Sequence, residues 1–197
     1  MQRVFLTGAQ TPKVVVFTGI VGGNGCTSVC AESALALVAQ SSKTVCLVDG
    51  DLRCPSVHRY FGMSNERGIA QAMTESGPIT DYGRQFVDGK LWIMTSGVCH
   101  TGGQLLASEA MRARLKDLRD TFDFVLIDAP PITSFVDAIQ LGCLADGVVL
   151  VVGANSTRRE AAVRAKQYLN AANCRVLAAV LNRRTFPIPA SIFRWLK

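Results

Sequence analysis

The sequence predicts an α/β fold, a three-layer α/β/α domain whose central sheet is mostly parallel. The first observation behind this prediction is that short apolar, often β-branched runs alternate with helical patterns along the chain. Runs that are apolar along their whole length are typical of parallel strands covered by helices on both faces. The second observation is size: 197 residues, 49% of them hydrophobic, suffice for one substantial core. We therefore expect residues 1–197 to form a single domain.

The first half of the chain begins this alternation. Residues 1–12 carry no periodic pattern and are expected to lead into a strand over 13–18. A helix rich in Ala and Leu is expected over 26–40, and the next apolar run predicts a strand over 44–48. Residues 52–90 are rich in Gly, Ser and Pro, so we expect a long insertion beyond the sheet with only short helical patches.

The second half repeats the same pattern. Apolar runs predict further strands over residues 91–94, 122–127, 148–152 and 176–181. Apolar residues at helical spacing, with a capping start in the last case, predict helices over 103–120, 134–144 and 157–172. Residues 183–197 show no clear pattern, and we expect 185–197 to form a flexible tail.

A glycine-rich segment lies between the first strand and the first helix. It consists of Gly22, Gly23, Asn24, Gly25, Cys26, Thr27 and Ser28. Glycines let several backbone N–H groups face one anion, and a helix start adds partial positive charge, so the segment predicts a phosphate-binding loop (P-loop). In the pattern G-x-x-x-x-G-K-[ST], Gly25 and Thr27 fill their positions, whereas Cys26 occupies the lysine position. The sequence therefore predicts a nucleotide cradle without its usual cation.

Carboxylates follow two of the predicted strands, at the edge of the sheet where ligands bind in such folds. We expect the Thr27 hydroxyl to bind the Mg²⁺ of a nucleotide and Asp128 to hold that ion indirectly. Asp49 and Asp51 are the candidate catalytic pair: one would act as a base toward a hydroxyl or water, and the other would help to hold the metal, for which Asp51 is the candidate. The alternative is that these aspartates only cap helices or form turns.

Longer motifs carry a family resemblance. Residues 49–55 (DGDLRCP) resemble the second nucleotide motif of the bacterial tyrosine kinases of capsule and exopolysaccharide synthesis, the CpsD/CapB family. Residues 105–111 (LLASEAM), 124–131 (FVLIDAPP) and 144–147 (LADG) are similar to the same family. These kinases belong to the MinD/ParA branch of P-loop ATPases. The resemblance covers about residues 13–184, nearly the whole chain.

The resemblance implies binding of ATP or ADP with Mg²⁺ and a role in polysaccharide synthesis or export. It places Asn182 near the adenine ring. It also implies a membrane-embedded polysaccharide co-polymerase or export component as partner, and a homo-oligomer. Nucleic acid is not an expected partner.

Three departures from the family pattern favour a regulatory protein with weak or no kinase activity. Cys26 replaces a lysine whose charge-assisted contact is worth roughly 1.5–3 kcal/mol, and losing a transition-state donor slows reactions by ~10²–10³. The chain has only three tyrosines, so the C-terminal tyrosine cluster of the family is missing. The residues before Lys13 lack the E-x-x-R-x-x-R helix that builds the family's ring. Arg53 and Arg158, both just past strand ends, are candidates to replace the lost charge.

Two other functions compete with this interpretation. One is a MinD/ParA-like positioning ATPase that uses a basic C-terminal region on membrane or DNA. Such ATPases usually keep lysines at the positions of Val21 and Cys26, and this chain has neither. The other is a nucleotide-free interaction or scaffold pseudoenzyme, which has no physical need for the retained glycines, Thr27 and Asp128.

Charge and cysteine content bear on location. Residues 158–197 carry a net charge of +8, whereas the rest of the chain carries −2. A basic end predicts an anionic partner, so we expect peripheral membrane contact through the C-terminal region. The seven cysteines are odd in number and contain no C-x-x-C pair, which is typical of free thiols in a reducing compartment. We therefore expect a cytoplasmic protein, at the inner face of the membrane.

Overall fold

A computed structural model describes residue 5 and residues 11–99, 102–154 and 156–184. Its strands form one sheet in the order β3-β4-β2-β5-β1-β6-β7. Six strands run parallel: β1 Val14–Gly19, β2 Val45–Asp49, β4 Leu91–Met94, β5 Phe124–Ala129, β6 Gly147–Gly153 and β7 Val176–Asn182. The edge strand β3 (Arg84–Phe86) pairs antiparallel with β4. The predicted mostly parallel α/β fold is confirmed.

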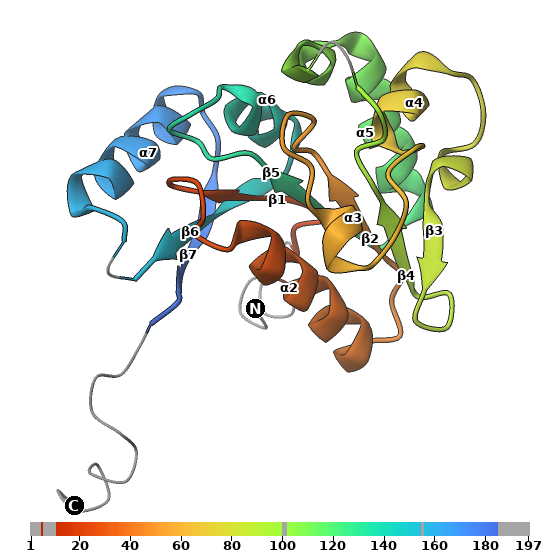
Figure 1. Cartoon of the computed structure of the whole chain (residues 1–197), viewed down its shortest axis with the longest axis horizontal. Helices are drawn as coiled ribbons and strands as arrows, with labels where there is room; N and C mark the ends of the chain where they lie inside the picture. Colours follow the sequence, from red (N-terminus) through yellow and green to blue (C-terminus); the bar gives the residue numbers. More distant parts are fainter. Residues whose placement is uncertain (1–4, 6–10, 100–101, 155, 185–197) are drawn as a thin grey trace, which may run out of the picture.

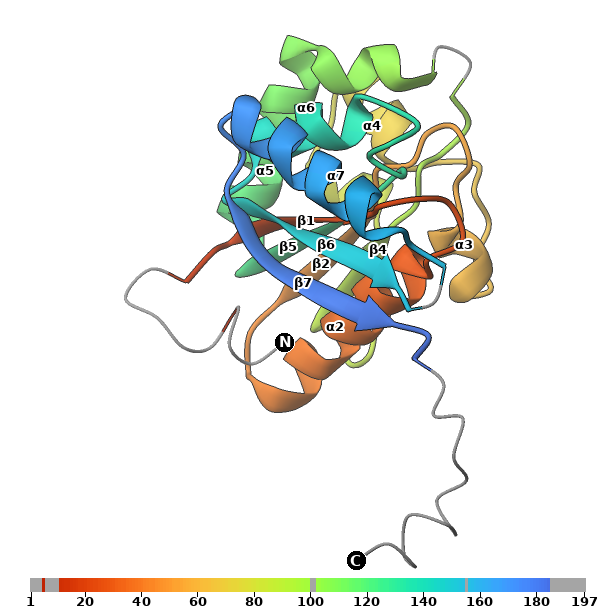
Figure 2. The ribbon, with the colours of Figure 1, turned by 90° about the vertical axis from the view of Figure 1, so that its left-hand side faces the viewer.

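Helices cover both faces of this sheet (Figures 1 and 2). One face carries α2 (Cys26–Gln40) and the short α3 (Val57–Tyr60). The other face carries α4 (Ile69–Thr74), α5 (Glu109–Thr121), α6 (Asp137–Leu144) and α7 (Arg159–Ala171). Two 3₁₀ segments, η1 (Ile79–Tyr82) and η2 (Gly102–Ala107), complete this second layer.

The central strands are buried on both faces, which explains their uninterrupted apolar sequence. In β1, Val15 and Phe17 pack with the α2 layer, whereas Val14 and Val16 pack with the opposite layer, and all four are 0% exposed. Burial of this kind contributes roughly 1.5–3 kcal/mol for each large apolar side chain. The sheet therefore forms a rigid base from which the loops at its carboxyl edge project.

Three elements differ from the sequence prediction. The strand β3 lies inside the expected insertion, and its three exposed residues are too few to show a period. The helix expected over 103–120 is instead a 3₁₀ segment followed by α5, because the Ser108 hydroxyl accepts a hydrogen bond from Met111 N (3.2 Å) and starts a new helix. The helix expected from residue 134 begins at Asp137, after a turn in which Ser134 N and Phe135 N donate to Pro131 O.

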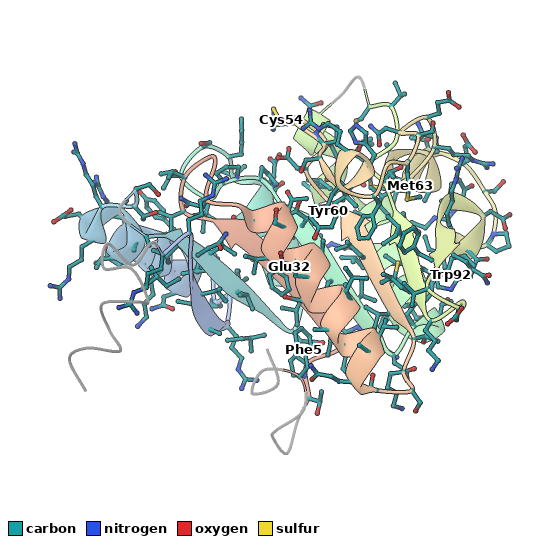
Figure 3. All side chains as sticks on the ribbon, turned by 60° about the horizontal axis from the view of Figure 1, so that its bottom comes forward. Phe5, Glu32, Cys54, Tyr60, Met63 and Trp92 are labelled. Atoms are coloured by element: carbon teal, nitrogen blue, oxygen red, sulfur yellow. The ribbon has the colours of Figure 1, made fainter. Side chains whose placement is uncertain are left out.

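The expected lead-in also contains a core residue. Phe5, labelled in Figure 3, is 1% exposed. Its ring lies 5.7 Å from that of Phe124, edge to face. A single aromatic residue without a period around it gives no signal in a sequence pattern. The predicted tail, 185–197, lies outside the described residues. Within the described part of the chain, no helix combines the length and apolarity that a bilayer span requires.

Candidate nucleotide site

The loop between β1 and α2 has the shape that a phosphate cradle needs. Gly23 and Gly25 both adopt φ of +77°, in the left-handed region that favours glycine. Asn24 is 2% exposed, and its side-chain Oδ1 accepts a hydrogen bond from Val21 N (3.0 Å), which closes the loop from within. Helix α2 starts at Cys26 without a side-chain cap, so its first N–H groups remain available to an anion.

Residues from distant strands hold this loop in place. The amide of Asn182, at the end of β7, donates to Asn24 O (2.9 Å). That amide also closely approaches Gly25, where a Cβ atom would lie 2.6 Å from its nitrogen. The structure thus gives Asn182 a bracing role beneath the loop, and its predicted contact with adenine stays a prediction.

The predicted metal residues Thr27 and Asp128 meet directly. The Thr27 hydroxyl donates to Asp128 Oδ2 (2.5 Å) and lies 2.7 Å from the hydroxyl of Ser56. The other carboxylate oxygen of Asp128, Oδ1, is buried without a hydrogen-bond partner among the described residues. Ser56 was not singled out from the sequence, because a serine 29 positions after Thr27 carries no local signal.

Two buried carboxylates lie side by side beneath the loop. Asp49 and Asp128 are register partners on β2 and β5, and they are 0% and 2% exposed. Burial, followed by the negative charge of Asp49, raises the pKa of Asp128 to about 7, while Thr27 and Cys26 act in the opposite direction. Burial likewise raises the pKa of Asp49 to about 6, against three backbone hydrogen bonds that lower it. The pair therefore favours a nearby cation or proton.

The structure separates the predicted catalytic pair. Asp49 accepts hydrogen bonds from Ser56 N and Val57 N (both 2.9 Å), and so caps α3. Asp51 is partly exposed and lines the cavity in front of the loop, while its Oδ1 accepts from Cys54 N (2.9 Å). Of the two, Asp51 is the carboxylate that a bound molecule would reach.

Cys26 is neutral in this site. Burial, and then the negative charge of Asp128, raise the pKa of the Cys26 thiol well above its usual value. A protonated thiol is a weak hydrogen-bond donor and carries no charge. Cys26 therefore fills the position of the lysine without supplying its electrostatic attraction for phosphate.

A cavity of about 540 Å³ opens in front of the loop. It is lined by most of the predicted loop residues (Gly22, Gly23, Asn24, Gly25, Cys26 and Thr27) together with Asp51 and Asp128. Ser28 and Asn182 are not among its lining residues. The structure adds residues that the sequence did not single out, among them Ser56, Phe135 and Arg59. It also places Arg183 in the lining, one of the polar residues expected at this edge because it follows the last predicted strand.

Neither arginine expected to replace the lysine lines this cavity. The guanidinium of Arg53 pairs with the buried Asp137 (Nε to Oδ2, 2.8 Å) and lies 4.6 Å from the centre of the Phe135 ring. Arg158 is exposed at the start of α7. That expectation from the sequence was wrong, because contacts made only in the folded chain decide where each guanidinium lies.

The residues present fit a Mg²⁺–nucleotide complex. The hydroxyl of Thr27 and the unpartnered Oδ1 of Asp128 are hard oxygen donors of the kind Mg²⁺ prefers. In the described chain, no three His, Cys, Asp or Glu side chains gather into a metal-binding group. Mg²⁺ keeps several waters and often shares phosphate oxygens, so a site with few protein ligands suits it.

Comparison with known proteins shows which family has a similar sequence. The family model described as "ParA: NUBPL iron-transfer P-loop NTPase" matches residues 10–192. The tyrosine-protein kinase YwqD of Bacillus subtilis (strain 168) is 32% identical over 171 residues, which cover 86% of this chain and 72% of YwqD. Longer relatives such as the Escherichia coli tyrosine-protein kinase etk match over 23% of their length.

Solved structures agree with these sequence matches. The chimerical protein CapA2B2 superposes with a TM-score of 0.87 at 25% identity, over 94% of this chain and 82% of that one. The kinase domain of the Escherichia coli tyrosine kinase ETK gives a TM-score of 0.81 at 27% identity, over 89% and 71% of the two chains. The likeness extends across most of this chain.

Proposed function

Since the chain belongs to the bacterial tyrosine-kinase family of ParA-type P-loop NTPases, we propose that it is an ATP-binding regulator of exopolysaccharide or capsule synthesis or export, with weak or no kinase activity. The observation that carries the proposal is the Thr27–Asp128 contact of 2.5 Å beneath an intact glycine loop that opens on a cavity. A partly buried threonine beside a buried carboxylate at this point suits a Mg²⁺–nucleotide complex.

Each part of the site would contact a different part of the nucleotide. Backbone N–H groups of the loop and of the first turn of α2 would hold the phosphates. Thr27 would hold the metal directly and Asp128 through water, and the bound Mg²⁺ would neutralise phosphate charge. Asp51, which lines the cavity, would help to hold the metal or act as a base, with Asp49 behind it positioning α3. Asn182 would fix the loop and contact adenine.

Cys26 is the reason to propose weak turnover. Its neutral thiol does not follow negative charge into a phosphoryl-transfer transition state, and loss of one such donor typically costs ~10²–10³ in rate. Backbone donors and Mg²⁺ do not depend on that side chain. Nucleotide binding therefore survives where catalysis does not, which is the property of a nucleotide-responsive regulator.

The family supports a proposal for the partner, and the charge distribution supports one for the location. We propose a membrane-embedded polysaccharide co-polymerase or export component as the partner, contact with the inner face of the membrane through the basic C-terminal region, and assembly into a homo-oligomer. The net charge of +8 over residues 158–197 supports attraction to an anionic surface. Liposomes with and without anionic lipid test this contact by co-sedimentation.

Calorimetric titration of ATP and ADP, with Mg²⁺, into the wild type and Cys26→Lys tests the nucleotide proposal. We expect micromolar binding to the wild type, and roughly 10- to 100-fold tighter binding to Cys26→Lys because a charge-assisted contact returns. If only Cys26→Lys binds, the native chain is a scaffold. If neither protein binds, the nucleotide proposal is wrong. A phosphotransfer assay on both proteins then shows whether the lysine alone restores activity.

A further inference from the structure

We infer that Arg59 and Arg183 form a two-sided phosphate-binding site that supplies the positive charge absent at Cys26. This inference rests on the proposed nucleotide binding and says which residues recognise the phosphates. Both arginines line the cavity in front of the glycine loop, and among its described lining residues they are the basic ones. They come from opposite sides of that loop, Arg59 from α3 after β2 and Arg183 from the segment after β7.

The two guanidiniums are available to a ligand. Both residues are exposed, and within the described chain neither side chain makes a hydrogen bond or an ion pair. Arg53, in contrast, is already neutralised by Asp137 at 2.8 Å. An unpaired guanidinium at the mouth of a cavity keeps its five donors free for phosphate oxygens.

Arg183 lies against the loop itself. Its Nε lies 3.6 Å from the point that a Cβ atom on Gly25 would occupy. Arg183 also has φ of +56°, which turns the chain directly after the strand residue Asn182. Its guanidinium is thus placed beside the loop N–H groups, where the inner phosphates of a nucleotide would lie.

Arg59 lies at the other side, near the proposed metal position. The cavity wall there is formed by Thr27, Asp51 and Ser56, and Ser56 directly precedes the helix that carries Arg59. The terminal phosphate of a nucleotide triphosphate would lie on this side, next to the metal. Arg59 therefore contacts a nucleoside triphosphate but not a diphosphate, and so makes the site prefer ATP over ADP.

Electrostatics makes this arrangement necessary for tight binding. Three carboxylates, Asp49, Asp51 and Asp128, lie in or directly behind the cavity, and Cys26 is neutral. A polyphosphate brings further negative charge, and a bound Mg²⁺ offsets only part of it. Two guanidiniums on opposite sides offset the remainder and screen the phosphates from the carboxylates.

The test compares Arg59→Gln and Arg183→Gln by titration calorimetry with ATP, ADP and adenosine in Mg²⁺ buffer. We expect Arg183→Gln to weaken ATP and ADP alike by about 10- to 100-fold, and Arg59→Gln to weaken ATP by that factor but ADP by less than about 3-fold. Adenosine affinity is expected to stay unchanged in both variants. Both residues are exposed, so unchanged circular dichroism is expected to confirm that the variants fold.

Matched controls are Arg175→Gln, at the opposite end of β7, and Arg84→Gln, on the edge strand; both arginines are exposed and outside the cavity. If the wild type binds neither nucleotide, the proposed function itself fails. If the wild type binds but Arg59→Gln and Arg183→Gln behave like the controls, nucleotide binding stands and the two-arginine site is refuted. Equal losses for ATP and ADP in Arg59→Gln would refute its assignment to the terminal phosphate.

Discussion

Replacing Asp128 with asparagine measures how much the buried negative charge beneath the loop lowers the free energy of unfolding. The asparagine side chain would keep an oxygen acceptor for the Thr27 hydroxyl, which lies 2.5 Å from the carboxylate, and would remove the negative charge beside Asp49. In the folded chain the pKa of Asp128 is raised from 3.8 to about 7 by burial and by Asp49. We therefore expect Asp128→Asn to stabilise the metal-free protein at alkaline pH.

The size and sign of this effect follow from proton linkage. A carboxyl whose pKa is raised on folding binds a proton more tightly when folded, so its contribution to stability is complete below pH 3.8 and is lost as pH rises to about 7. Each unit of pKa shift corresponds to about 1.4 kcal/mol. The wild type thus bears a penalty of about 4 kcal/mol at pH 8 that Asp128→Asn avoids.

Urea unfolding followed by circular dichroism between pH 4 and pH 8, with a chelator present, measures this difference. We expect the free energy of unfolding of Asp128→Asn to be higher than that of the wild type by up to about 4 kcal/mol at pH 8. Near pH 4 the two free energies are expected to be similar. Added Mg²⁺ is expected to reduce this difference in the free energy of unfolding, because it stabilises only the wild type. A variant that is less stable at pH 8, or a gap independent of pH, would refute the reasoning.

Asp146 provides a control in which the pH dependence of stability is expected to have the opposite sign. Arg119 and the N–H groups of Lys13 and Val14 hold the pKa of Asp146 below its usual value, although its partial burial acts in the other direction. A lowered pKa gives stability that is present at neutral pH and is lost as pH falls. Asp146→Asn is therefore expected to destabilise the protein most at neutral pH, the reverse of Asp128→Asn.

Two further substitutions test packing outside the cavity lining. Gly68→Ala is expected to destabilise by about 1–3 kcal/mol, because its Cβ atom would overlap the carbonyl of Thr95 and disturb the bond from Ile69 N to that oxygen. Phe5→Ala is expected to cost about 3–5 kcal/mol, because a buried ring packed against Phe124 is lost. Urea unfolding at pH 7 measures both.

The controls for these substitutions have similar chemistry without the contacts. A Cβ atom on Gly22 would meet no atom within 4 Å, so Gly22→Ala is expected to change the free energy of unfolding by less than about 0.5 kcal/mol. Tyr168 is 51% exposed, and Tyr168→Ala is expected to be equally mild. If Phe5→Ala proves as mild as Tyr168→Ala, the packing of Phe5 on the sheet is contradicted.

The sequence by itself determined the alternation of strands and helices, the glycine loop and the polar residues after each strand. These features are local: a buried parallel strand must be apolar throughout, and a left-handed turn such as that at Gly23 favours glycine. The same locality explains the errors. Strand β3 is too short to show a period, and the boundary at Ser108 depends on one side-chain hydrogen bond.

Only the tertiary structure decided which charges face the cavity. The register of β2 and β5 places Asp49 beside Asp128, and the fold commits Arg53 to Asp137. It also sets the contact of Arg183 with the loop at Gly25, which the order of strand ends along the chain does not specify. The hydrophobic pattern of a segment indicates only whether that segment is buried or exposed. The electrostatics of a site depends instead on the distances between charged groups on different segments, and the packing of the sheet sets those distances.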